Sequence, residues 1–492
     1  MLQNRPKIIR NKLFILQKYE NNLIKSTFVP QNIKNMLISE LYTLYNQHPV
    51  ITTDSRVCPY GSIFFALKGE SFDGNAFAEK ALQSGCSYAV IDDISYCADD
   101  RMILVDDVLT TLQQLACMHR KTLGIPVIGI TGTNGKTTTK ELAAAVLSKK
   151  YNTLYTQGNL NNHIGVPLTL LRLTGKHEIA VIEMGANHPG EIRDLANIAR
   201  PDLGLITNVG YAHLEGFGSF EGVVRTKGEL YEFVRIAGGK VFINKDNEYL
   251  TEIAGDLEQI TYGMMPDFET PEKELFVSGK VLSRNPFLSF VWQQQGKGTQ
   301  HYVETHLVGD YNLCNALAAI TVGVYFDIAP EQINDAIANY EPSNNRSQLI
   351  KTKNNTITID AYNANPSSMR AALENFASPP EKSLKTHFGD PRTKPSVTTV
   401  ESLPKAVILG DMLELGEKSP ELHTDIIKLT ETLGIEKILL CGEQFSAVGK
   451  NHICFSSVVA LDEFLKEEPL CGYHILIKGS HGIHLEKIID KL

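Results

Sequence analysis

The chain has 492 residues, with 47 Lys and Arg against 56 Asp and Glu, and a formal net charge of −9. This length exceeds what one hydrophobic core usually supports, so three domains are expected. The acidic balance argues against a surface that binds nucleic acid regardless of sequence. No run approaches the roughly 18 apolar residues that a membrane span needs. The eight cysteines form no C-x-x-C pair and lie in apolar surroundings, which predicts reduced thiols and a cytoplasmic protein.

The first 35 residues differ in composition from those that follow. They are basic at first, and their apolar stretch, Leu13 to Leu16, is too short for the hydrophobic region of a signal peptide. We interpret residues 1–35 as an appendage. From Met36 the pattern becomes domain-like, with a helical start followed by strand, helix and strand. A small α/β domain is therefore predicted over residues 36–124.

A glycine-rich turn follows the β-branched run Val127 to Ile130 and precedes a stretch of helical composition. Gly132 and Gly135 allow backbone N–H groups to face an anion, and the following helix offers its positive end. Lys136 adds a mobile positive charge, and the Thr137 hydroxyl can ligate Mg²⁺. The strict phosphate-loop pattern would have a glycine at position 130, where this chain has isoleucine. The order of strand, glycines, lysine, hydroxyl and helix nevertheless favours a nucleoside triphosphate site over a solvated turn. The residues expected to bind the nucleotide here are Gly132, Thr133, Asn134, Gly135, Lys136, Thr137 and Thr138.

Two further apolar strands are predicted in the central part, which we assign to residues 125–340. Ile179 to Ile182 ends on Glu183, and Leu203 to Thr207 precedes a loop that contains His213. Parallel strands present their carboxyl ends at one edge, so Glu183 is a candidate Mg²⁺ ligand beside the phosphate loop. The alternative for Glu183 is a solvated carboxylate at a strand end. A histidine beside Mg²⁺ is unusual because hard cations prefer oxygen. Spacing alone therefore favours a structural role for His213 at least as strongly as a role as a metal ligand.

The C-terminal part, residues 341–492, begins with a linker and then alternates strands with helices. Residues 378–403 are rich in Pro, Ser, Thr and Lys, and we expect a disordered insertion there. The predicted fold class is α/β with three domains. The first is small, the second is a P-loop ATPase-type domain with a mostly parallel sheet, and the third is a doubly wound, Rossmann-like domain. The strands predicted in the third domain are Thr356 to Asp360, Ala406 to Leu409, Lys437 to Leu440 and His474 to Ile477.

Several motifs, in order along the chain, together resemble those of the Mur ligase family. They are Thr131 to Thr137, Glu183 to His188, Ala212 to Gly218, Asn312 with Asn315, Asn345-Arg346, and Asp360 to Pro366. The stretch Leu409 to Gly416 is similar to that of the branch that joins D-alanyl-D-alanine to UDP-N-acetylmuramoyl-tripeptide. The resemblance implies an ATP-driven cytoplasmic ligase of peptidoglycan precursor synthesis, which converts a peptide carboxylate to an acyl phosphate before an amine attacks it. We expect the protein to be a monomer.

The resemblance also implies roles for residues. Lys136 would bind the ATP phosphates, and Thr137 with Glu183 would hold one Mg²⁺. His213 would help to hold a second Mg²⁺ together with Lys227, which matches a lysine that family members carry as a carbamate. Lys136, His213 and Lys227 are therefore the candidate catalytic residues.

Nucleotide and substrate contacts are implied in the same way. Asn312 and Asn315 would contact the adenine side, Asp360 the ribose and Arg346 the phosphates. The UDP-sugar substrate would meet two loops, and the residues expected there are Ser55, Arg56, Asn159, Asn161 and Asn162. One departure is His481, which stands where family members often have arginine.

Two other functions compete with this interpretation. A sister ligase of the same architecture would add a different amino acid, or glutamate to folate, and the motif that ends at Gly416 argues against it. A nucleotide switch is suggested by Asn244 to Asn247, which resembles a guanine-reading N-K-x-D loop. Asn247 replaces the aspartate that would accept hydrogen bonds from guanine, so this motif is incomplete.

Overall fold

The computed structural model describes residues 36–265, 274–284, 286–342, 346–378 and 403–492. The predicted appendage, residues 1–35, and nearly all of the predicted insertion at 378–403 lie outside these ranges. Contacts divide the chain into two compact units, Met1–Met118 and His119–Leu492. Within the described ranges, no helix combines the length and apolar character needed to cross a membrane.

The first unit contains a four-stranded parallel sheet in the order β1-β2-β3-β4. Its strands are β1 (Ile51–Thr52), β2 (Ile63–Phe65), β3 (Tyr88–Ile91) and β4 (Met102–Leu104). Its helices are α2 (Ile38–Gln47), α3 (Ala78–Gln83) and the start of α4 (Val108–Leu123). All three residues of β2 are apolar and buried, as expected for a parallel strand covered on both faces.

The second unit contains a nine-stranded sheet in the order β13-β12-β11-β10-β9-β8-β5-β7-β6. The seven strands from β11 to β6 in this order pair in parallel, and β12 and β13 extend the sheet as antiparallel strands. The mostly parallel central sheet is therefore confirmed. The strands are β5 (Val127–Thr131), β6 (Thr153–Tyr155), β7 (Ile179–Glu183), β8 (Leu203–Ile206), β9 (Lys240–Asn244), β10 (Glu258–Met264), β11 (Val277–Ser283), β12 (Ser289–Gln294) and β13 (Gln300–Glu304).

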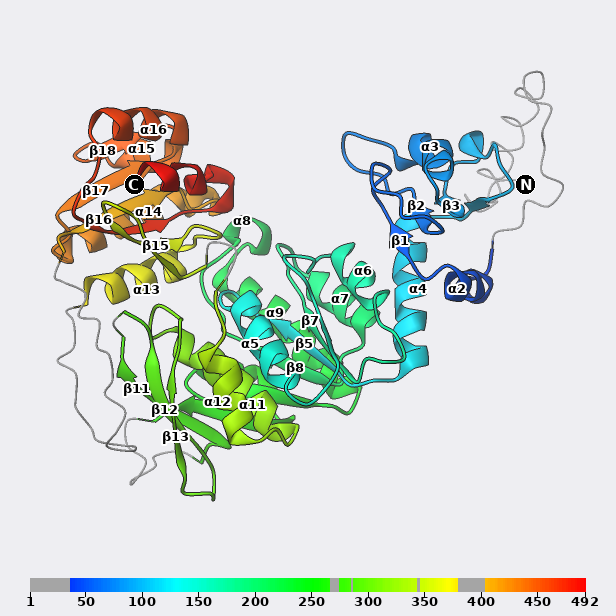
Figure 1. Ribbon diagram of the computed structural model, residues 1–492, viewed down its shortest axis with the longest axis horizontal. Coiled ribbons are helices and arrows are strands. Elements are labelled where there is room, and N and C mark those ends of the chain that lie inside the picture. Colours follow the sequence, from blue (N-terminus) through cyan, green and yellow to red (C-terminus); the bar gives the residue numbers. More distant parts are fainter. Residues whose placement is uncertain (1–35, 266–273, 285, 343–345, 379–402) are drawn as a thin grey trace, which may run out of the picture. The chain divides into compact units, whose positions relative to one another are not determined.

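Helices pack on this sheet and place some of their residues at its edge. Figure 1 shows α5, α11 and α12 side by side, and their apolar residues pack with the strands in one core that includes Leu142, Leu317 and Ile333. Helices α7 and α9 contact each other; α7 also contacts β5, and α9 contacts β5 and β8. The helices are α5 (Lys136–Leu147), α6 (Gly165–Leu170), α7 (Glu191–Ala199), α8 (Leu214–Phe217), α9 (Phe220–Ile236), α10 (Glu248–Ala254), α11 (Asn312–Tyr325) and α12 (Pro330–Ala338).

The C-terminal sheet has the order β14-β15-β19-β16-β17-β18, and β14 is its antiparallel strand. Alternate residues of β16 enter different cores: Ile408 belongs to one cluster, and Val407 and Leu409 belong to another. Side chains of a strand alternate between faces, so both faces are covered and the doubly wound prediction is confirmed. The elements are β14 (Gln348–Lys351), β15 (Thr356–Asp360), α13 (Pro366–Ala377), β16 (Lys405–Gly410), α14 (Ser419–Thr432), β17 (Lys437–Cys441), α15 (Glu443–Val448), β18 (Ile453–Phe455), α16 (Val458–Glu467) and β19 (His474–Lys478).

Candidate active site

The turn between β5 and α5 is closed in by neighbours that leave room only for glycine at two positions. Gly132 has φ +143°, and a Cβ there would lie 2.0 Å from Oγ1 of Thr207. Gly135 has φ +76°, and a Cβ there would lie 2.4 Å from Oδ1 of Asn315. Residues with a Cβ seldom adopt such positive φ values. Both the backbone conformation and the lack of space for a Cβ therefore require glycine. The turn is thereby held between the end of β8 and the start of α11.

Lys136 is the cation of this turn. Its Nζ donates hydrogen bonds to the carbonyl oxygens of Gly132, at 2.8 Å, and Thr133, at 3.0 Å. Burial lowers the pKa of Lys136 to about 8; the Glu183 carboxylate opposes this shift, and the Arg346 cation adds to it. The positive charges of Lys136 and Arg346 therefore repel each other, and an anion bound between them would stabilise the charged form of both side chains.

Glu183 lies at the end of β7 beside the turn and is only 1% exposed. Its Oε1 accepts hydrogen bonds from Oγ1 of Thr137, at 3.2 Å, and Nδ2 of Asn161, at 2.8 Å. Its Oε2 is buried without a hydrogen-bond partner in the described chain, and Nζ of Lys140 lies 3.6 Å away. A buried carboxylate oxygen without a hydrogen bond is costly, and a hard cation held with the Thr137 hydroxyl would satisfy it. These residues fit Mg²⁺.

The position of Lys140 was not predicted from sequence. It is fully buried between Glu183 and Glu141, with Nζ 3.5 Å from Oε1 of Glu141. A lysine one helical turn after Lys136 could have indicated it, because residues four apart share a helix face. In the described parts of the chain, no three His, Cys, Asp or Glu side chains form a ready-made metal cage. A Mg²⁺ ion at Glu183 would therefore take further ligands from bound phosphate or water.

Lys227 of α9 and His213, which precedes α8, both lie against the ring of Phe217. Nζ of Lys227 lies 5.1 Å from the ring centroid and donates to the carbonyl oxygen of Ala186 at 3.3 Å. The imidazole of His213 meets the same ring edge-on at 6.2 Å, and its Nδ1 contacts Oε2 of Glu414. Lys227 is 2% exposed. Burial, and to a smaller extent the charge of Lys136, hold its pKa well below the ordinary range. Burial therefore favours the neutral amine over the charged one at this position.

The amides at the start of α11 form a chain that reaches α5. Nδ2 of Asn312 donates to the carbonyl oxygen of Val308 at 2.8 Å, and Nδ2 of Asn315 donates to Oδ1 of Asn312 at 2.9 Å. Oδ1 of Asn315 accepts from Oγ1 of Thr139 at 3.1 Å. Both amides are buried, so they position the phosphate turn here. Their contact with adenine stays a prediction.

Arg346 and Asp360 lie in the C-terminal part of the second unit. The guanidinium of Arg346 lies 3.8 Å from the centroid of the Tyr362 ring, and the His481 ring also stacks on Tyr362, at 5.6 Å and 21°. Nε of Arg346 has no hydrogen-bond partner within the described ranges, so stacking leaves guanidinium donors for an anion. Oδ2 of Asp360 accepts from Nζ of Lys478 at 2.5 Å. That pairing was missed because it depends on β15 and β19 being neighbours, with Asp360 and Lys478 in register.

The residues predicted to bind the UDP-sugar lie in two loops. Ser55 and Arg56 follow β1 in the first unit, where a bidentate contact with Arg56 lowers the pKa of Asp54 to about 2. Asn161 reaches Glu183, whereas Oδ1 of Asn162 accepts from the N–H groups of Ile164 and Gly165 and so starts α6. Asn159 is exposed. The sugar contacts of these residues stay predictions.

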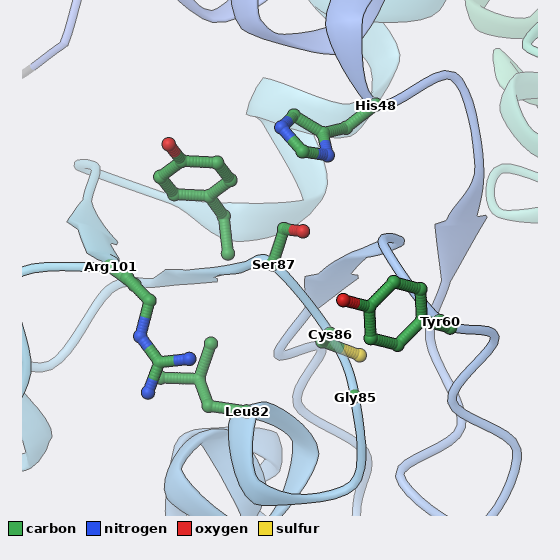
Figure 2. Close-up of a pocket in the computed structure, with 8 residues that line it drawn as sticks. His48, Tyr60, Leu82, Gly85, Cys86, Ser87 and Arg101 are labelled. Carbon is green, nitrogen blue, oxygen red and sulfur yellow. The ribbon is translucent and has the colours of Figure 1, made fainter.

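A cavity of about 350 Å³ lies in the first unit (Figure 2). Tyr88 begins β3 and Arg101 immediately precedes β4, so the cavity lies at the amino ends of these strands. Ser55 and Arg56 follow a carboxyl end and do not line it. Its lining residues are His48, Tyr60, Leu82, Gly85, Cys86, Ser87, Tyr88 and Arg101.

The guanine-like motif has a structural explanation. Oδ1 of Asn244 accepts from the N–H of Asp246 at 3.0 Å, and Oδ1 of Asn247 caps α10 by accepting from the N–H of Leu250 at 3.2 Å. Oδ2 of Asp246 accepts from the N–H of Met264 at 2.6 Å. These are turn and cap contacts that need no nucleotide.

Two acids of the Leu409 to Gly416 motif make different contacts: one is structural and the other reaches the site. Asp411 is 2% exposed, and its carboxylate accepts from the N–H groups of Gln444 and Phe445 at 2.9 and 2.8 Å, which caps α15. Glu414 instead contacts His213. The sequence did not indicate this contact, because the two residues are 201 positions apart.

A phosphate turn with a buried acid beside it, at the carboxyl edge of a mostly parallel sheet, defines a class of P-loop nucleotide-binding proteins. Comparisons then identify the family. The Mur ligase middle domain matches residues 130–323, and the model described as "Mur ligase family, catalytic domain" matches residues 49–120. The chain belongs to the Mur ligase family.

Curated relatives match nearly the whole chain. The UDP-N-acetylmuramoyl-tripeptide--D-alanyl-D-alanine ligase of Bacillus subtilis (strain 168) is 34% identical over 96% of this chain and 99% of its own. The enzyme of that name from Escherichia coli (strain K12) is 32% identical over 90% of this chain and 93% of its own. Among solved structures, MurF from Acinetobacter baumannii is 28% identical with a TM-score of 0.77, over 90% of this chain and 92% of its own. MurF ligase from Thermotoga maritima in complex with ADP shares the fold, at 24% identity and a TM-score of 0.75, over 90% of this chain and 97% of its own.

Proposed function

We propose that this chain is an ATP-dependent ligase that adds D-alanyl-D-alanine to UDP-N-acetylmuramoyl-tripeptide in cell-wall precursor synthesis. The observation that carries the proposal is the phosphate turn, with Lys136 and Arg346 acting on one region, in a chain that matches ligases of that name along almost their full length. None of the eight cysteines, all of which lie in the described ranges, forms a disulfide, and this supports a reducing, cytoplasmic compartment. We propose a monomer as the working form.

The chain's own residues account for phosphoryl transfer. The turn at Gly132 and Gly135 cradles the ATP phosphates, Lys136 moves from its carbonyl partners to the phosphates, and Arg346 donates from its stacked position. The peptide carboxylate attacks the γ-phosphorus, and ADP leaves. Thr137 and Glu183 would hold a Mg²⁺ ion, which supplies charge neutralisation at the phosphates.

Amide formation follows on the acyl phosphate. The amine of the incoming dipeptide attacks the activated carbonyl carbon, the tetrahedral intermediate expels inorganic phosphate, and the amine loses its proton. Phosphorylation is needed because a free carboxylate is a poor electrophile. Cationic donors at the site stabilise the charge that develops on phosphate oxygens.

Lys227 is proposed to work as a carbamate. Burial favours its neutral amine, which is the form that attacks CO₂, and one proton is released as the carbamate forms. The product is an anionic oxygen ligand in place of a cation that would repel a metal ion. Together with His213 it would hold a second Mg²⁺. The alternative is a plain lysine that contacts phosphate.

Product mass analysis tests the ligase proposal. The protein is incubated with ATP, D-alanyl-D-alanine and UDP-N-acetylmuramoyl-tripeptides that end in lysine or in a diamino diacid. The expected product is the corresponding UDP-pentapeptide with stoichiometric ADP and phosphate. Single amino acids and folate with glutamate serve as alternative acceptors. Turnover of an alternative, with none for D-alanyl-D-alanine, would show a sister ligase instead.

A further inference from the structure

The contact between His213 and Glu414 joins two residues with unusual backbones. Six described residues other than glycine have positive φ, and two of them are His213, at φ +50°, and Glu414, at φ +62°. Such conformations cost free energy in residues with a Cβ and are found where function requires them. Glycine would relieve the backbone at either position but would remove the side chain. The two residues contact each other, so the two left-handed turns form one feature of the structure.

The backbone around the pair fixes how the two segments meet. The N–H of Glu215 donates to the carbonyl oxygen of Glu414 at 3.3 Å. A Cβ at Gly416, which has φ +58°, would lie 3.6 Å from the side chain of Glu215. The start of α8 is thus held on the loop after β16 by backbone as well as side-chain contacts. This places the Glu414 carboxylate at the imidazole without relying on a long flexible side chain alone.

The imidazole of His213 is held on two sides. Nδ1 faces the Glu414 carboxylate, and the ring lies edge-on to Phe217 at 86°. A carboxylate accepts hydrogen bonds, so Nδ1 must carry a hydrogen and donate it. Nε2 is then left as the nitrogen with a lone pair whenever the ring is neutral. No described residue hydrogen-bonds Nε2 in this structure.

We propose that Glu414 is a positioning residue for the ligase reaction: it holds His213 as the Nδ1–H tautomer and directs Nε2 toward the reacting groups beside Lys227. This inference rests on the proposed function for the identity of those groups. A carboxylate behind an imidazole fixes the orientation of the ring and its tautomer. Glu414 of the Leu409 to Gly416 motif thus acts through His213 rather than on substrate directly.

The first experiment reads the tautomer in the full chain without ligands. Histidine labelled with ¹⁵N is incorporated, the spectrum is recorded at pH 8.5, and the His213 signals are identified by their absence in His213→Gln. Wild type is expected to show hydrogen on Nδ1, whereas Glu414→Ala should shift toward the Nε2–H form that free histidine favours. Glu414→Gln keeps an acceptor oxygen and should retain Nδ1–H. An unchanged tautomer in Glu414→Ala overturns the proposal.

The second experiment measures steady-state ligation in the same variants, with Glu417→Ala as a matched control because Glu417 is an exposed acid three residues further on. Glu414→Ala is expected to lower kcat 10- to 100-fold, the range typical of such supporting carboxylates, with little change in KM for ATP. Glu414→Gln should recover part of kcat, and Glu417→Ala should match wild type.

Other outcomes separate the competing explanations. A Glu414→Ala variant that keeps kcat but loses thermal stability would show a structural contact between segments and overturn the proposal. A higher kcat in that variant would show that Glu414 withholds His213 from the reaction, which also overturns it. If wild type fails to ligate D-alanyl-D-alanine, the proposed function fails, while the tautomer result still decides the role of Glu414 toward His213.

Discussion

Replacing Gly135 with alanine tests whether the phosphate turn is fixed by its neighbour on α11. The new Cβ would lie 2.4 Å from Oδ1 of Asn315, in a residue whose φ is +76°. Asn315 cannot easily retreat, because its Oδ1 accepts from Thr139 and its Nδ2 donates to Asn312. It is also only 8% exposed. Either the amide turns away or the turn itself moves.

The two responses have different magnitudes and readouts. An alanine at positive φ costs about 1–2 kcal/mol. If Asn315 turns away, its amide and the Thr139 hydroxyl lose their partners at a buried position, at about 1–3 kcal/mol each. The free energy of unfolding would then fall by about 3–8 kcal/mol in total. If the turn moves instead, the loss appears in nucleotide affinity, because a displacement near 1 Å can cost about 100-fold at a positioned site.

Urea unfolding and calorimetric binding of ADP measure both responses in Gly135→Ala. Gly238→Ala is the matched control, since Gly238 has φ +70° and open space around its Cβ position. It should lose about 1–2 kcal/mol of unfolding free energy and bind ADP normally. In an Asn315→Ala background the added cost of Gly135→Ala should shrink, because the clashing atom is gone. Strictly additive costs, or equal effects of Gly135→Ala and Gly238→Ala, would refute the reasoning.

Three further predictions concern other parts of the site and its supports. Burial, with the Lys405 charge, lowers the pKa of His474 to about 4. Between pH 6.5 and 4 this imidazole is therefore protonated in the unfolded chain but neutral in the folded chain. Stability should fall by about 3 kcal/mol as pH drops through that window, and His474→Gln should flatten the dependence in urea unfolding. Asp411→Ala leaves two capped N–H groups unpaired and should cost about 2–4 kcal/mol, against under about 0.5 kcal/mol for the exposed Asp425→Ala. Lys227→Ala should lose most turnover and regain part of it when a short carboxylate such as acetate is added.

Each of these three predictions would be contradicted by a specific result. If His474→Gln keeps the pH dependence of the wild type, the loss of stability at acid pH comes from other groups. Equal unfolding free energies for Asp411→Ala and Asp425→Ala would show that the cap of α15 is not needed. Wild-type turnover in Lys227→Ala, or rescue by amines and never by carboxylates, would contradict the carbamate.

The sequence by itself determined the parts whose signals are local. The apolar run before Gly132 predicted β5, because a buried parallel strand needs uninterrupted apolar residues. The order of glycines, Lys136 and a following helix predicted the phosphate turn, because that chemistry depends on neighbouring backbone groups. Glu183 was found by the rule that parallel strands present their carboxyl ends at one edge.

The tertiary structure decided what depends on neighbours that are distant in the chain. Asp360 pairs with Lys478 because β15 lies beside β19, and no periodicity in the sequence records strand order. Lys140 is buried because α5 turns its face toward Glu183. Glu414 reaches His213 across 201 positions through two left-handed residues, a geometry that only packing can impose. Local patterns specify elements and turns, whereas the pairing of charged side chains is fixed by how those elements assemble.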